Sequence, residues 1–94
     1  MAYTYGPGGA RAAFNVTATT LIKAAPGTLF RVVVVTAPTA AGGVYDSATT
    51  GGISASNQIA TVPTAVGPIE LLWPCQNGIV VNPGTGGVVS VSYT

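Results

Sequence analysis

The chain has 94 residues, of which 48% are hydrophobic and only 5% are charged, and its formal net charge is +1. A nucleic-acid surface needs clustered Lys and Arg, which three basic residues in the whole chain do not supply. Histidine is absent, which excludes His-based catalytic triads and His metal sites. No apolar run is long enough to span a bilayer, and the N-terminus lacks a signal-peptide pattern, so we expect a protein kept in a cytoplasm or in a particle assembled there.

The first segment of the chain, residues 1–13, is predicted to be a flexible N-terminal arm. It holds a Gly-Pro-Gly-Gly cluster at residues 6–9 and shows no sustained periodicity. Tyr3 and Tyr5 alternate with small residues, so the arm can add as a strand to the sheet edge of a neighbouring chain, with the tyrosines as anchors. A frayed terminus is the equally weighted alternative. Residues 14–94 are predicted to form a single domain.

Residues 29–36 hold the densest run of β-branched side chains, including four consecutive valines. Such side chains lose freedom in a helix and fit a pleated surface, which predicts a strand. Because both alternating faces are apolar after Arg31, we expect this strand to be covered on both sides. The cover must come from a second sheet or from another copy of the chain.

Two dipeptides in the chain are strong turn signals. Pro26-Gly27 is predicted to form a type II turn that joins the strand before it to the valine strand as a hairpin or a corner. Asn77-Gly78 is predicted to close a tight hairpin. The other predicted strands are separated by Gly-rich and Pro-rich loops and lie at residues 18–25, 44–47, 57–62, 68–73, 79–81 and 88–93.

The last predicted strand alternates regularly, with Val89, Val91 and Tyr93 on one face and Val88 and Ser90 on the other. No segment of the sequence has the pattern of an amphipathic helix. Seven or eight short antiparallel strands predict an all-β fold, either a small β-sandwich or a jelly-roll-like barrel.

The two carboxylates, Asp46 and Glu70, lie on separate predicted strands. Glycoside hydrolysis by such a pair needs a deep cleft, so we expect solvent or interface charges instead, with Arg31 and Lys23 as candidate ion-pair partners. The Gly-rich loop at residues 83–87 lacks the Lys and the following helix of a phosphate-binding loop. We therefore expect no catalytic residue, no metal site and no cofactor, and hence no enzyme.

Two residues near one another invite a chemical interpretation and are predicted to be structural. Cys75 lies in an apolar neighbourhood and is expected to be a buried packing thiol. Trp73 lies among apolar residues, so we predict a core or subunit-interface aromatic rather than an exposed stacking residue.

The low charge indicates association with partners. A surface built mainly from Ala, Gly, Thr, Ser and Asn has little to keep copies apart, so we expect much of it to be buried in a homo-oligomer. The alternative is a solvated surface rich in Thr, Ser and Ala.

Several segments together resemble small proteins encoded among tailed-bacteriophage virion genes, and the resemblance covers most of the chain after the arm. The segments are residues 21–27 (LIKAAPG), 32–35 (VVVV), 73–75 (WPC), 78–81 (GIVV) and 83–86 (PGTG). The resemblance implies a virion structural protein, most like a capsid decoration (cement) protein of β-sandwich type. Such families often sit as trimers at local three-fold positions and brace neighbouring capsid subunits. It therefore implies a non-enzymatic homo-oligomer, with a trimer favoured, that binds the major capsid protein in the virion, and no nucleic-acid or membrane partner.

Within this expectation the sandwich makes the oligomer, and the arm reaches a neighbour through Tyr3, Tyr5 and Arg11 as partner-binding residues. Two alternatives stay open. One is a head-to-tail connector or tail-tip ring component. The other is a carbohydrate-binding β-module displayed on the particle, which requires Trp73 or a tyrosine to be exposed.

Overall fold

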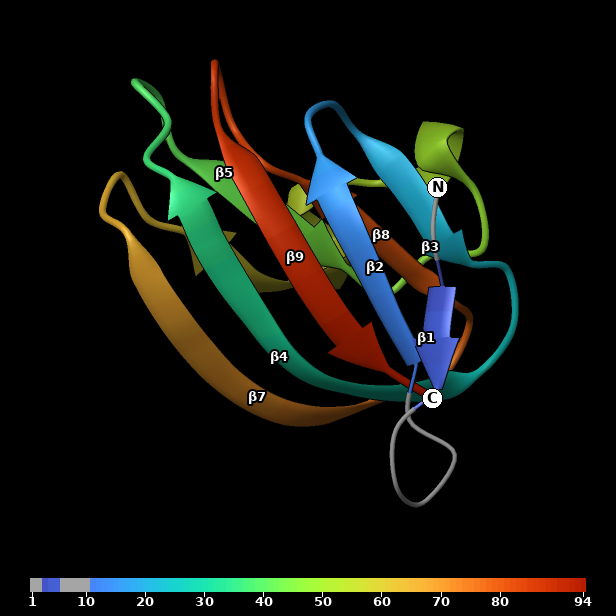
Figure 1. Cartoon of the computed structure of the whole chain (residues 1–94). Helices are drawn as coiled ribbons and strands as arrows, with labels where there is room; N and C mark the ends of the chain where they lie inside the picture. The colour runs from blue at the N-terminus through green and yellow to red at the C-terminus, as the bar shows by residue number, and fades with distance from the viewer. Residues whose placement is uncertain (1–2, 6–10) are drawn as a thin grey trace.

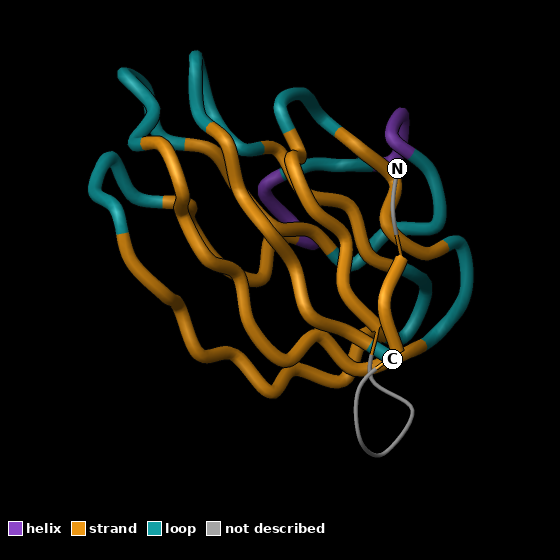
Figure 2. The backbone as a smooth tube through the Cα atoms, viewed as in Figure 1, coloured by secondary structure: helices purple, strands orange, loops and turns teal. Residues whose placement is uncertain are grey.

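The computed structural model describes residues 3–5, as backbone, and residues 11–94. These residues form two stacked β-sheets, with two short 3-10 turns and no α-helix in the described chain (Figures 1 and 2). This confirms the all-β sandwich prediction. The strands are β1 (Tyr3–Tyr5), β2 (Arg11–Val16), β3 (Thr20–Lys23), β4 (Gly27–Thr36), β5 (Gly42–Tyr45), β6 (Gln58–Val62), β7 (Gly67–Cys75), β8 (Ile79–Asn82) and β9 (Val88–Tyr93), and the 3-10 turns are η2 (Thr50–Gly52) and η3 (Ala55–Asn57).

The strand order is that of a jelly roll. One sheet has the order β1-β2-β9-β4-β7 and the other the order β3-β8-β5-β6, and every pairing is antiparallel. If β1 is left out and the other eight strands are numbered 1 to 8 along the chain, one sheet has the order 1-8-3-6 and the other has the order 2-7-4-5. This arrangement is a double Greek key. After β2, the chain therefore changes sheet at almost every connection, and only β5 and β6 are consecutive and paired.

The core lies between the two sheets and is built from β-branched side chains. On β9, the predicted alternation is confirmed, because Val89, Val91 and Tyr93 are buried whereas Val88 and Ser90 are partly exposed. The fully buried side chains of the other strands are Ala13 and Val16 on β2, Leu29, Val32 and Val34 on β4, Val44 on β5, Val62 on β6, and Ile79, Val80 and Val81 on β8. No described helix is long and apolar enough to cross a membrane.

The valine strand β4 is covered by this chain on one face only. Val32 and Val34 point into the core, whereas Val33 is partly exposed and the exposed fraction of Val35 is 53%. The second sheet therefore covers one face of β4, as predicted, and the described chain leaves the other face open. In a two-layer sandwich each sheet turns one face outward, and no described part of the chain lies over this one.

Both predicted turns proved to be sheet-to-sheet crossings. The hairpin predicted at Asn77-Gly78 is wrong, because β7 lies in the five-stranded sheet and β8 in the other. Pro26-Gly27 is the corner between β3 and β4, and Gly27 lacks the positive φ that a type II turn requires. These glycines serve close packing instead: a Cβ on Gly78 would lie 2.6 Å from the carbonyl oxygen of Lys23 and still nearer to that of Ser47.

The sandwich begins earlier than the sequence indicates. β2 starts at Arg11, and Ala13 is fully buried in the core, so residues 11–13 belong to the sheet rather than to an arm. The physical reason is the period-two alternation of a strand, which turns Ala13 inward. Residues 1–2 and 6–10 of the predicted arm lie outside the described residues.

Candidate functional site

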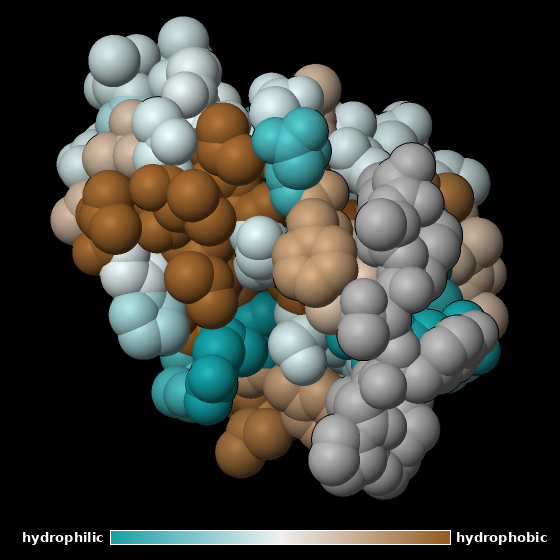
Figure 3. Space-filling view, in the orientation of Figure 1, coloured by the Kyte–Doolittle hydropathy of each residue, from teal (hydrophilic) through white to brown (hydrophobic). Residues whose placement is uncertain are grey.

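Apolar side chains gather on the outer face of the five-stranded sheet. We call it the outer face and define it by the outward side chains of β2, β9 and β4, which are Ala12, Phe14, Val88, Ser90, Ser92, Arg31, Val33 and Val35. Figure 3 shows this side of the molecule, with apolar side chains gathered over β4 and β7 and hydrophilic groups interrupting them. Exposed apolar area of this kind marks interaction surfaces in soluble proteins.

Phe14 lies on this face beside a bulge in β2. The pairing of β2 with β9 shifts register between Ala13 and Val16, and Asn15 takes a positive φ of 56°. Asn accepts this conformation more readily than most residues. Phe14 follows the inward Ala13 and therefore points outward by the alternation of the strand, and its exposed fraction is 46%. The bulge adds one residue after it, so that Val16 is again buried.

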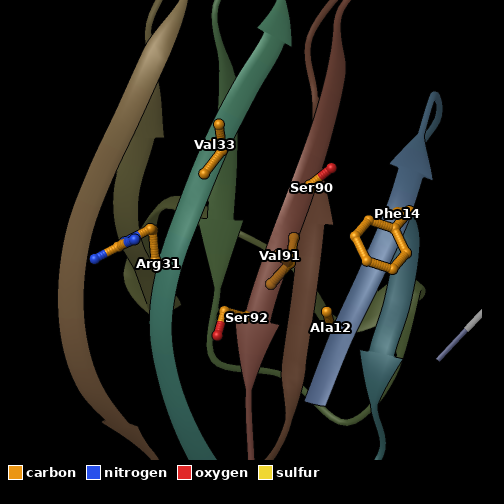
Figure 4. A pocket seen from close by; sticks show the side chains of 7 residues that line it. All are labelled: Ala12, Phe14, Arg31, Val33, Ser90, Val91 and Ser92. Atoms are coloured by element: carbon orange, nitrogen blue, oxygen red, sulfur yellow. The ribbon is translucent and has the colours of Figure 1, made fainter. Parts of the chain in front are cut away.

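A shallow depression of about 210 Å³ lies in the middle of the outer face (Figure 4). Small side chains on β9 lower the surface between the larger side chains of β2 and β4, and Val91 reaches it from below. Its lining residues are Ala12, Phe14, Arg31, Val33, Ser90, Val91 and Ser92. We call this depression the socket. Its lining combines an aromatic ring, a valine, two hydroxyls and one guanidinium.

The charges at the edge of the socket are already paired. Arg31 on β4 and Glu70 on β7 are register partners, and their side chains form an ion pair. This confirms Arg31 as a partner for one of the two acids. Both side chains are at least half exposed, so the pair contributes at most about 1 kcal/mol to stability. Its consequence is that the outer face carries no uncompensated charge at this point.

A bulge in β7 lies beside two large apolar side chains that are exposed at the edge of the same sheet. The pairing with β4 shifts register between Leu29 and Arg31, and Leu72 has a positive φ of 50°. The exposed fractions are 67% for Leu72 and 47% for Trp73. Trp73 is therefore not a core residue. Of the two roles predicted for it, core and subunit interface, the interface role stays a prediction. We call Leu72 and Trp73 the knob.

The residues predicted to bind a partner lie at the opposite edge of the sheet. Tyr3 and Tyr5 belong to β1, whose backbone pairs with β2 so that Tyr3 faces Ala13 and Tyr5 faces Arg11. β1 thus extends the chain's own sheet, and the tyrosine side chains lie outside the described residues. Arg11 is exposed and is the register partner of Tyr93 on its other side.

The second carboxylate has a structural role. Asp46 follows β5 and accepts hydrogen bonds from the backbone N–H groups of Gln76 and Asn77, both at 2.8 Å, and of Gly78 at 3.3 Å. Burial by itself raises the pKa of Asp46, but the backbone donors outweigh it and hold the pKa below the ordinary value. Among the described residues no group of three metal-ligating side chains comes together.

The prediction of a buried thiol is confirmed. Cys75 ends β7 and is 3% exposed. Burial, with a further contribution from the Asp46 charge, raises the pKa of the thiol to about 11. A thiol with this pKa is protonated at neutral pH and is a poor nucleophile.

Sequence reasoning missed Phe14 and the knob. The signal for the outer face was present in the valine run, whose alternate members Val33 and Val35 are apolar on the side that the sandwich leaves open. The bulge beside Leu72 leaves no such pattern. Comparison with protein-family models, curated proteins and solved structures finds no match for the chain.

Proposed function

We propose that this protein is a non-enzymatic virion structural protein that binds the outside of an assembled phage capsid as a symmetric oligomer and stabilises it. The observation that carries the proposal is the outer face, where Phe14 and Val35 are about half exposed on a sheet that no described part of the chain covers. The low charge of the chain supports the same conclusion, since nothing on this face repels a second copy. Jelly rolls occur in viral capsid domains and in lectins, so the architecture is compatible with the proposal and does not by itself select it.

The mechanism is mass action. An oligomer that binds the assembled shell and not its precursor adds its binding free energy to the assembled state alone. Closed symmetry lets one oligomer contact several capsid subunits at once, so weak single contacts add up to a stable attachment. The protein needs no reactive group for this task.

The first experiment is the native mass of the purified chain by light scattering at several concentrations, followed by co-sedimentation with expanded and with precursor shells of the phage that encodes it. We expect a trimer that sediments with expanded shells only. A hexamer or larger ring would favour a connector or tail-tip component. A strict monomer that leaves both kinds of shell unbound would overturn the proposal.

The role of the arm is tested by deleting residues 1–10, which keeps Arg11 and the buried Ala13 in β2. We expect the oligomer to stay intact and binding to the shell to be lost. Thr4→Ala, which keeps both tyrosines, is the matched control and should bind normally. Normal binding by the deletion variant would remove the arm, with Tyr3 and Tyr5, from the capsid contact.

One observation favours a second candidate, a carbohydrate-binding module. Trp73 is about half exposed and is the only tryptophan in the chain, so its side chain is accessible for stacking on a sugar ring. Its fluorescence reports any such binding directly. Saturable quenching by a sugar in a monomeric sample would favour this candidate over the structural role.

A further inference from the structure

We infer that the knob of one copy inserts into the socket of a second copy, and that this contact builds the oligomer. The inference rests on the self-association in the proposed function and adds which two surfaces make it. Both surfaces belong to the five-stranded sheet, the knob at the β7 edge and the socket over β2, β9 and β4.

The knob has the properties of an interface anchor. A positive φ costs a residue with a side chain about 1–2 kcal/mol, and Leu72 takes one while two-thirds of it is exposed to solvent. Trp73 beside it is half exposed, and tryptophan is among the residues that most often dominate binding energy. The strained backbone of Leu72 and the exposure of Leu72 and Trp73 are both explained if the bulge presents these side chains to a partner.

The socket fits an aromatic side chain in size and chemistry. A cavity of about 150 Å³ accommodates benzene, and the socket offers about 210 Å³. The Ser90 and Ser92 hydroxyls that line it can accept a hydrogen bond from the indole N–H. The Arg31 guanidinium at its rim can lie over the indole ring, which is the preferred partner for a cation–π contact.

No charge on either surface opposes the contact. The knob and its neighbours, residues 71–76, carry no charged side chain, so they bring no charge into the socket. The one charge that lines the socket, on Arg31, is paired with Glu70 and stays paired when the knob enters. The contact therefore buries no isolated charge, which is the main penalty that would oppose it.

The surface area of the chain suits such an assembly. A standard interface buries about 800 Å² on each partner, and a ring in which each copy uses a knob side and a socket side needs two such contacts. The chain exposes 4694 Å², so the ring would cover about a third of it. Since knob and socket are different patches, copies join head to tail. The assembly is a closed ring when the rotation that relates neighbouring copies adds up to a full turn.

The knob and the middle of the socket are well separated within one chain, which favours a contact between copies. Along the sheet, Trp73 is the register partner of Leu29, which faces Tyr93 on β9. Ser90 therefore lies two strands away and three residues further along, about 10 Å in each direction. The middle of the socket therefore lies two strands away from the knob of its own chain.

The test uses one knob variant, one socket variant and a matched control. Trp73→Ala removes the anchor, and Ser90→Arg fills the socket and places a second cation beside Arg31. By light scattering, each variant alone should be monomeric at concentrations where the unchanged chain is oligomeric. An equal mixture should recover a dimer, because the intact knob of the Ser90→Arg chain meets the intact socket of the Trp73→Ala chain. Val66→Ser, at a residue as exposed as Leu72 and outside both surfaces, should remain oligomeric.

Trp73 fluorescence gives a second readout that does not depend on the variants folding equally well. In the oligomer, its emission should shift to the blue and acrylamide quenching should fall several-fold relative to the diluted monomer. An oligomer whose Trp73 stays as quenchable as in the monomer, or two variants that keep their native mass, would overturn the knob-and-socket contact and leave the proposed function standing. A monomeric unchanged chain would instead count against the self-association in the proposed function.

Discussion

The carboxylate of Asp46 accepts a hydrogen bond from the backbone N–H of Asn77 at 2.8 Å, joining two loops that are 31 residues apart in the chain. Its two oxygens also accept hydrogen bonds from the backbone N–H groups of Gln76 and Gly78. The end of β5 is thereby tied to the crossing from β7 to β8. The Asn-Gly dipeptide, the usual signal of a hairpin, is held by this tie in a connection that leads the chain from one sheet to the other.

Asp46→Asn should lower the free energy of unfolding by about 1–2 kcal/mol, because an amide offers one acceptor oxygen to three backbone donors and turns its NH₂ group toward them. Chemical denaturation of both proteins at neutral pH measures the difference. Glu70→Gln is the matched control, since the same chemical change at the half-exposed Arg31 pair should cost well under 1 kcal/mol. Equal losses in the two variants would contradict the structural role of Asp46.

The contribution of Asp46 should depend on pH in a defined direction. Its pKa is lower in the folded chain than the ordinary value of 3.8, so its stabilisation is fully present above that value and is lost as the pH falls through the lower, folded pKa. The stability difference between the unchanged chain and Asp46→Asn should therefore shrink between about pH 5 and about pH 2. A difference that stays constant over this range would show that ionisation of Asp46 does not stabilise the fold.

Cys75 should resist alkylation in the native protein. The pKa of its thiol rises from 9.0 to about 11, which lowers the thiolate fraction near neutral pH about 100-fold, and burial limits access further. Iodoacetamide labelling followed by mass spectrometry should be at least that much slower in the native chain than in denaturant. Because the Asp46 charge contributes to the high pKa, Asp46→Asn should lower the pKa of the thiol. Equal labelling rates with and without denaturant would show that the thiol is exposed.

Gly78→Ala should destabilise the fold by about 2–3 kcal/mol. The added methyl group would approach the carbonyl oxygens of Ser47 and Lys23 and the Cα of Ala48, all of them backbone atoms that cannot turn aside. Gly51→Ala is the matched control, since a Cβ there has no neighbour within 4 Å and its stability should change by less than about 1 kcal/mol. Thermal unfolding of the two variants measures the contrast, and similar melting temperatures would contradict the close packing at Gly78.

The sequence alone predicted most strands of the fold, from residue 18 onward, because those strands have local causes; β1 and β2 were not predicted as strands of this sheet. β-branched runs and period-two alternation placed β4 and β9, and Gly and Pro placed the breaks between strands, to within a few residues. The alternation on β9 even predicted which side chains enter the core. The absence of helical periodicity excluded α-helices and left a sandwich or jelly roll.

Only the tertiary structure decided how the strands pair, because pairing depends on contacts between residues far apart in the chain. Asn77-Gly78 carries the same local signal in a hairpin and in a crossing, and in this fold its backbone N–H groups donate to the distant Asp46. The apolar alternate face of β4 indicated that something covers it, but a local pattern does not distinguish a second sheet from a second copy. The exposure of Leu72 and Trp73 depends on where the β7 bulge falls against β4, which is a property of the assembled sheet and not of either strand alone.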